Sequence, residues 1–302
     1  MIGPEKEENK MLGDDIIING SRAIARSYAK INLTLDVLGR REDGYHDVRM
    51  VMQTVSLADW ITISKCHSDI SVSTNLPYLP NNDKNIAAIA AREFYNYTGR
   101  NGGCKIKIRK YIPVAAGLAG GSGNAAAVLC ALNKLYNTGL TMEELCSIGR
   151  RIGADVPYCI MGCTALAEGI GEKLTPLAPM PKATILLVRP DINISTKDIY
   201  EAIDSEEISK RPDTDAMILA LENGDLNAIA SNLSNVMGTF IEREYPIVKG
   251  IRRKMMINGA IGAVMSGSGP TVFGIFDDFY TAKRSHDSFA HQFREVYLAS
   301  TL

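Results

Sequence analysis

The sequence lacks several features that would assign it to a particular class of protein. Its 302 residues carry a formal net charge of −1, and 33 Lys and Arg stand against 34 Asp and Glu. Without an excess of basic residues the chain is a poor match for a nucleic-acid backbone, so we expect no DNA or RNA partner. A small anionic ligand is compatible with this balance, because it needs only a local group of N–H donors and one or two cations.

Export and membrane signals are also lacking. Residues 1–10 are rich in charge, whereas an export signal requires an apolar stretch. The longest uncharged run, residues 112–133, contains a proline and four glycines, which makes it a poor membrane span. We therefore predict a cytoplasmic protein without membrane contact or an obligatory protein partner, in which residues 1–20 form a flexible leader.

The six cysteines form no CxxC pair. Cys159 and Cys163 are four residues apart, but no His or second Cys pair completes a metal-binding set. Reduced, buried thiols are the expected state of these side chains.

Hydrophobic periodicity predicts a mixture of strands and helices. Alternating and β-rich runs predict strands over 22–38, 51–64, 104–111, 162–169, 184–188, 260–265 and 271–276. Helical spacing predicts helices over 83–97, 124–136, 141–151, 197–203, 215–223, 225–235, 244–257 and 281–298. Three prolines at 176, 179 and 181 suggest a linker, so we place two domains at 21–176 and 177–302. This mixed order of elements predicts an α+β fold.

A glycine-rich stretch, residues 113–127, is the most informative segment. Four glycines within seven residues leave backbone N–H groups uncovered, and the stretch leads directly into a predicted helix. The unpaired N–H groups and the dipole of a helix N-terminus bind anions such as phosphate. Ser122 contacts a phosphate or its metal ion, caps the helix, or does both. The stretch is not a Walker A loop, because no Gly-Lys-Ser/Thr ends it.

Two further groups of polar residues stand in apolar surroundings. Lys30 and Asn32 are two residues apart on a predicted strand, so their side chains share a face, either at a site or on the surface. Asp155 precedes a proline, and is either a turn residue or a carboxylate paired with Lys30. An ammonium group beside a carboxylate keeps it ionised, ready to orient or deprotonate a hydroxyl. Residues 262–272 predict a strand, a glycine loop and another strand.

Three segments taken together resemble the signature motifs of GHMP kinases. They are Ala-Lys-Ile-Asn-Leu at 29–33, the glycine-rich stretch at 113–127, and Met-Ser-Gly-Ser-Gly-Pro-Thr at 265–271. Arg-Glu-Asp-Gly-Tyr-His at 41–46 and Gly-Ala-Asp-Val-Pro at 153–157 are similar to the branch that uses ATP to phosphorylate the C2 hydroxyl of 4-diphosphocytidyl-2-C-methyl-D-erythritol. The resemblance implies a two-domain α+β fold with the active site in the interdomain cleft.

The resemblance also implies residue roles. Asp155 is expected as catalytic base and Lys30 as its charged partner, while Asn32 binds the erythritol hydroxyls. The cytosine is expected to contact Tyr45, His46 and Tyr200. Two departures from the family pattern, Ala119 and Gly123, affect the nucleotide loop.

ATP with Mg²⁺ is the implied cosubstrate, and Ser122 is the one implied protein ligand of the metal. The expected nucleotide contacts are Pro113, Ala115, Gly117, Leu118, Ala119, Gly120, Gly121, Ser122, Gly123, Asn124, Gly267, Ser268 and Gly269. Two alternatives stay open. One is a GHMP kinase for another alcohol, such as mevalonate or homoserine, and the other is a silent binding protein on this fold.

Overall fold

The computed structural model describes residues 15–67, 69–206, 208 and 210–302. Its strands are β1 Ile17–Asn19, β2 Arg22–Arg40, β3 His46–Cys66, β4 Ile70–Thr74, β5 Gly103–Arg109, β6 Thr164–Gly169, β7 Lys173–Pro176, β8 Thr184–Arg189, β9 Ser234–Asn235, β10 Gly262–Met265, β11 Val272–Phe276 and β12 Glu295–Ser300. Its helices are α1 Ile86–Thr98, α2 Gly120–Tyr136, α3 Met142–Arg150, α4 Val156–Met161, α5 Thr196–Ser205, α6 Thr214–Glu222, α7 Leu226–Ser231, α8 Val236–Glu244, α9 Pro246–Ile257 and α10 Phe279–Ala290. The predicted α+β class is confirmed.

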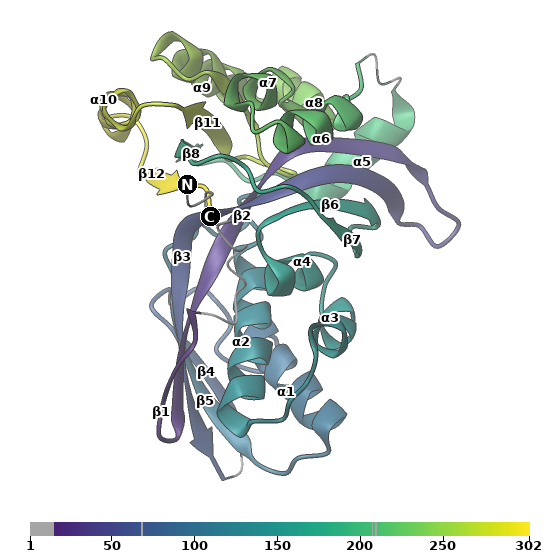
Figure 1. The fold of residues 1–302 in the computed structure, drawn as a ribbon, viewed down its shortest axis with the longest axis vertical. Coiled ribbons are helices and arrows are strands. Elements are labelled where there is room, and N and C mark those ends of the chain that lie inside the picture. The colour runs from purple at the N-terminus through teal and green to yellow at the C-terminus, as the bar shows by residue number, and fades with distance from the viewer. Residues whose placement is uncertain (1–14, 68, 207, 209) are drawn as a thin grey trace, which may run out of the picture.

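Two sheets organise the described chain. The larger one has the order β1-β2-β3-β5-β4, with β6 and β7 continuing from β3 and β9 pairing with β2. The smaller one has the order β10-β11-β8-β12. Helices α1 to α4 lie along one side of the larger sheet, while the long strands β2 and β3 extend past them to α5 and α6 (Figure 1). These two strands therefore span both halves of the molecule.

The alternation of β2 separates a packing face from a polar face. Ala29, Ile31 and Leu33 are fully buried in the cluster that also holds the inner residues of the smaller sheet. Lys30 and Asn32 project to the opposite side, as period two requires. The pairing of β2 with β3 shifts register between Tyr28 and Ala29 and again after Asn32. Such bulges are common beside active sites, where they change the direction of side chains.

Several elements differ from those predicted above. Helix α2 begins at Gly120, four residues earlier than predicted, because the glycine run itself is helical. The predicted last helix over 281–298 is wrong in its second half, because β12 pairs there with β8. The strands β4, β7 and β9 and the helices α4 and α8 were not predicted, and β9 occupies the end of the predicted helix over 225–235.

Part of the predicted leader is a strand. Ile17–Asn19 form β1 and pair with the start of β2, whereas residues 1–14 lie outside the described residues. Across the part of the chain that the structure describes, no helix has the length and apolar character needed to cross a bilayer.

Candidate active site

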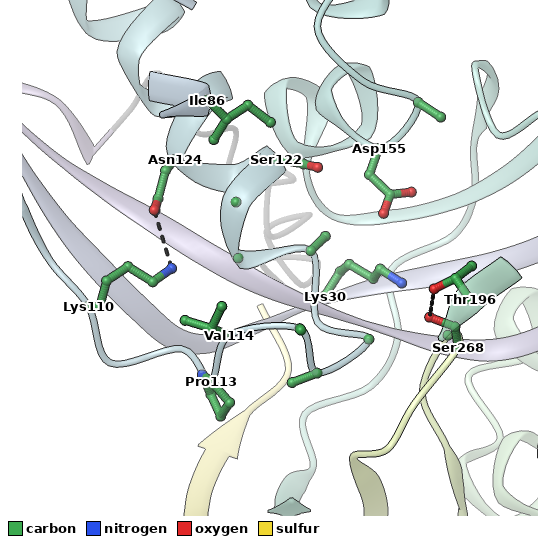
Figure 2. A pocket seen from close by; sticks show the side chains of 18 of the residues that line it. Lys30, Ile86, Lys110, Pro113, Val114, Ser122, Asn124, Asp155, Thr196 and Ser268 are labelled. Atoms are coloured by element: carbon green, nitrogen blue, oxygen red, sulfur yellow. Dashed lines mark hydrogen bonds between the residues drawn. The ribbon is translucent and has the colours of Figure 1, made fainter. Parts of the chain in front are cut away.

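A cavity of about 580 Å³ lies where β2, the glycine-rich stretch, α4, α5 and the loop after β10 meet. Figure 2 shows Lys30, Ser122 and Asp155 around it, with Thr196 and Ser268 at one side. Thirteen of the predicted site residues line this cavity, namely Lys30, Pro113, Ala115, Gly117, Ala119, Gly120, Gly121, Ser122, Asn124, Asp155, Tyr200, Gly267 and Ser268. Asn32, Tyr45, His46, Leu118, Gly123 and Gly269 stand outside its wall.

The start of α2 leaves its N–H groups open towards the cavity. Its N-cap is Ala119, which adopts φ 52° and offers no capping side chain. Gly120, Gly121 and Ser122 form the first turn and all line the cavity. An uncapped helix start has unpaired N–H donors and a partial positive charge. Ser122 therefore lies inside the helix, and the alternative that it is the N-cap is wrong.

The glycine-rich stretch contacts a second glycine loop, residues 266–271 between β10 and β11. Ser266 Oγ donates to the carbonyl oxygen of Gly117 over 2.9 Å. A Cβ added to Gly117 would lie 2.1 Å from the carbonyl oxygen of Ser266, and φ there is +74°. Asn235 fixes the second loop, because its Nδ2 donates to the carbonyl oxygens of Met265 and Gly267 at 2.7 and 2.9 Å. The second loop therefore supports the first, and glycine is required at the contact.

The two departures from the family pattern, Ala119 and Gly123, differ in their local structure. Ala119 occupies a left-handed conformation that glycine adopts without strain. A Cβ at Gly123 would lie 2.7 Å from Ser27 Oγ, so the small residue suits its packing against β2.

Lys30 and Asn32 share one face of β2, as predicted. Lys30 Nζ donates to Asn32 Oδ1 over 2.6 Å, and both residues are buried. Asn32 Nδ2 in turn contacts Met50 Sδ at 3.2 Å. The amide thus orients the ammonium group at the edge of the cavity.

Asp155 immediately precedes α4 but does not cap it. Its side chain makes no capping hydrogen bond, and its carboxylate forms no hydrogen bond or ion pair with the described residues. The carboxylate projects into the cavity across from Lys30 (Figure 2). Burial, with the charge of Asp155 as a second cause, raises the pKa of Tyr200 above its usual value. A half-buried carboxylate without a partner is available to a bound hydroxyl group.

The aromatic residues predicted for the cytosine are arranged unevenly. His46 stacks on Tyr200, with ring centroids 4.4 Å apart and planes 16° apart. His46 Nε2 also lies 2.7 Å from Asp204 Oδ1. Tyr45 is 62% exposed in the preceding turn. The structure thus brings His46 against Tyr200, which lines the cavity, and leaves Tyr45 in solvent.

Sequence reasoning missed a buried polar group beneath the glycine-rich stretch. Lys110 lines the cavity and contacts both Asp59 and Asn124. A signal for it existed, because the alternation that turns Lys107 and Arg109 outward turns the next residue, Lys110, inward. Its partner Asp59 lies 51 positions earlier, where no local pattern points to it.

A further feature of the site is the set of side chains that could bind a metal ion. No cluster of three or more His, Cys, Asp or Glu with metal-binding geometry occurs among the described residues. The cavity offers the Ser122 hydroxyl beside the open N–H groups. This set suits an ion that is coordinated mainly by the phosphates of a bound nucleotide.

Comparison with family models identifies both halves of the chain. Residues 85–163 match the model of the GHMP kinase N-terminal domain, and residues 217–295 match that of the GHMP kinase C-terminal domain.

Among similar proteins, a 4-diphosphocytidyl-2-C-methyl-D-erythritol kinase of Caldicellulosiruptor saccharolyticus is 49% identical over 279 residues, covering 92% of this chain and 96% of the relative. A Clostridium perfringens protein of the same name is 46% identical, with 92% and 97% covered.

Solved structures give the same result for the fold. A 4-(cytidine 5′-diphospho)-2C-methyl-D-erythritol kinase superposes with a TM-score of 0.79 at 32% identity, covering 92% of this chain and 98% of that one. A homoserine kinase from Cytophaga hutchinsonii superposes with a TM-score of 0.75 at 16% identity, covering 94% and 96%, and supports the fold alone.

Proposed function

From the fact that this chain belongs to the 4-diphosphocytidyl-2-C-methyl-D-erythritol kinases of the GHMP family, we propose that it transfers the γ-phosphoryl group of ATP to the C2 hydroxyl of that diphosphocytidyl alcohol. The observation that carries the proposal is the Asp155 carboxylate, which has no side-chain partner among the described residues and lies opposite Lys30, in a cavity whose wall includes a glycine-rich helix start. The product would enter the non-mevalonate route to isoprenoid precursors.

In this proposal Asp155 accepts the proton of the C2 hydroxyl as the oxygen attacks phosphorus. Lys30, oriented by Asn32 over 2.6 Å, stabilises negative charge on the transferred group. The open N–H groups of Gly120, Gly121 and Ser122 bind the phosphates of ATP. Catalysis then consists mainly of positioning and charge stabilisation, as in phosphoryl transfer generally.

Mg²⁺ belongs to the proposal as a partner of ATP. The Ser122 hydroxyl is the side chain that would contact it, beside the nucleotide phosphates. A bound magnesium ion would neutralise part of the phosphate charge. The domain boundary after residue 176 and a cytoplasmic location, where ATP is available, are likewise proposed.

The aromatic residues Tyr200 and Tyr45 would recognise the cytidine group. Tyr200 offers an aromatic face next to Asp155, and the exposed Tyr45 has freedom to close over a base. Replacing Tyr45 by Ala should raise the KM for the cytidine substrate about 5- to 150-fold, because stacking on one base contributes about 1–3 kcal/mol. The KM for ATP should change little. Equal KM values for the cytidine substrate would remove Tyr45 from this role.

A coupled assay of ADP release tests the whole proposal. The enzyme is given ATP and Mg²⁺ with 4-diphosphocytidyl-2-C-methyl-D-erythritol, mevalonate or homoserine in parallel. We expect turnover with the cytidine compound alone. Turnover with one of the other two alcohols would keep the kinase chemistry and overturn the assigned acceptor, whereas no ADP release with any of them would overturn the activity.

A further inference from the structure

We propose that Asp59 and Lys110 form a neutral buried pair that positions the nucleotide loop, and that the Lys110 ammonium group is not a phosphate ligand although Lys110 lines the cavity. The inference rests on the proposed function, because it concerns how the ATP-binding stretch keeps its shape. Asp59 and Lys110 are thus positioning residues rather than catalytic ones.

Asp59 lies within β3 and is fully buried, and its carboxylate receives hydrogen bonds on both oxygens. The backbone N–H groups of Tyr111 and Ile112 donate to Oδ1 over 2.7 and 2.9 Å. Asn124 Nδ2 donates to Oδ2 over 2.8 Å, and Lys110 Nζ donates to the same oxygen. A buried carboxylate is stable only when its charge is balanced and its lone pairs are engaged, and both conditions hold here.

The partners of Asp59 belong to the elements that shape the site. Tyr111 and Ile112 lead directly into Pro113, where the glycine-rich stretch begins. Asn124 lies in the early turns of α2, and its Nδ2 also contacts Ser27 Oγ on β2 at 3.0 Å. Ser27 precedes Lys30 by three residues on the same strand. One carboxylate therefore connects both ends of the phosphate-binding stretch to the strand that carries Lys30.

The charge of Lys110 is already balanced within this group. Its side chain is 4% exposed and that of Asp59 is 0% exposed. Its ammonium also donates to Asn124 Oδ1 over 3.2 Å. A Cβ at Gly120 would lie 3.1 Å from Lys110 Nζ, so the lysine supports the first residue of α2 from beneath. Lys110 therefore contacts the first turns of α2 from the side that packs against β3. The phosphates would be bound by the open N–H groups of that helix start and not by the Lys110 ammonium group.

Three variants separate positioning from direct binding: Lys110→Met, Asp59→Asn, and the double variant. Each single change leaves one buried charge without its partner, so we expect MgADP binding, measured by calorimetry, to weaken about tenfold or more. The double variant keeps both volumes and restores neutrality. Its MgADP affinity and its KM for ATP should return to within about threefold of the unchanged protein, since the two changes compensate each other.

A direct phosphate contact predicts a different pattern. The double variant would then bind MgADP as weakly as Lys110→Met, because the ammonium is missing in both, and this result would overturn the inference. Single variants that bind like the unchanged protein would overturn it as well. If either single variant fails to fold, the double variant still decides, since it carries neither charge.

A matched control separates loss of loop geometry from loss of stability. Arg252 and Glu242 form a partly buried ion pair between α9 and α8, at 2.5 Å. The variant Arg252→Met/Glu242→Gln should lower the midpoint of urea unfolding without changing the KM for ATP. For the Asp59 and Lys110 single variants the KM for ATP should rise while the KM for the alcohol and the kcat at saturating ATP stay nearly constant. An unchanged protein that binds no MgADP would instead count against the proposed function.

Discussion

The contact between the two glycine loops allows a quantitative test at Gly117. In Gly117→Ala the new Cβ would meet the carbonyl oxygen of Ser266 at 2.1 Å and the amide nitrogen of Gly269 at 3.0 Å. Forcing alanine into the left-handed conformation costs about 1–2 kcal/mol. Overpacking adds about 1–3 kcal/mol, because the atoms that the new Cβ meets belong to the backbone and not to a flexible side chain. We expect the free energy of unfolding to fall by about 2–5 kcal/mol in urea, together with a rise in the KM for ATP.

Gly139→Ala provides the matched control. Gly139 also has a positive φ, of +70°, but no atom lies within 4 Å of an added Cβ. The control should therefore lose about 1–2 kcal/mol, from backbone strain alone, and keep its KM for ATP. If Gly117→Ala and Gly139→Ala lose the same stability and have the same KM for ATP, the contact between the loops is not the constraint described here.

Three further predictions concern other parts of the site and the core. Asp155→Asn should lower kcat by about 10²–10⁴-fold, the usual contribution of a general base, with an unchanged thermal midpoint; unaltered turnover would exclude Asp155 as the base. Ala119→Gly should stabilise the protein by about 0.5–1 kcal/mol, because glycine relieves the strain at φ 52°, and a loss of stability would contradict that reading. Burial raises the pKa of the Cys130 thiol to about 12, so a thiol reagent at pH 8 should label the part-exposed Cys66 and Cys146 first; early labelling of Cys130 would show that its pocket opens readily.

The parts of the fold that could be predicted from the sequence are those with a local signal. Lys30 and Asn32 were placed on one face by the period of a strand, and the 2.6 Å contact confirms that placement. The glycine-rich stretch indicated a helix start, although the helix begins within the glycines themselves. Glycine disfavours helix on its own, so packing against β2 and the second loop, rather than propensity, sets this boundary.

The parts that could not be predicted depend on partners far away in the sequence. The segment that forms β12 continues a helical spacing, because Phe293 and Val296 follow Phe289 by four and seven residues. It becomes a strand because β8, about a hundred residues earlier, offers an edge along its whole length. The propensities of a short sequence segment do not reveal such a pairing, because the backbone hydrogen bonds of a strand are made with residues outside that segment.

Asp59 and Lys110 show the same limit within the site. The alternation of β5, continued by one residue, is enough to turn Lys110 inward, although we did not predict this from the sequence. A lysine that points into a phosphate-binding cavity invites assignment as a phosphate ligand. What argues against that role is the carboxylate that reaches it from β3, together with the two backbone N–H groups that hold this carboxylate in place. The local pattern therefore gives the position of a charged side chain, while its role depends on whether the fold supplies a countercharge. In this protein Lys30 has an amide neighbour and faces Asp155 across an open cavity, whereas Lys110 is neutralised within the core. This difference separates the lysine that we propose as catalytic from the one that we propose as a positioning residue.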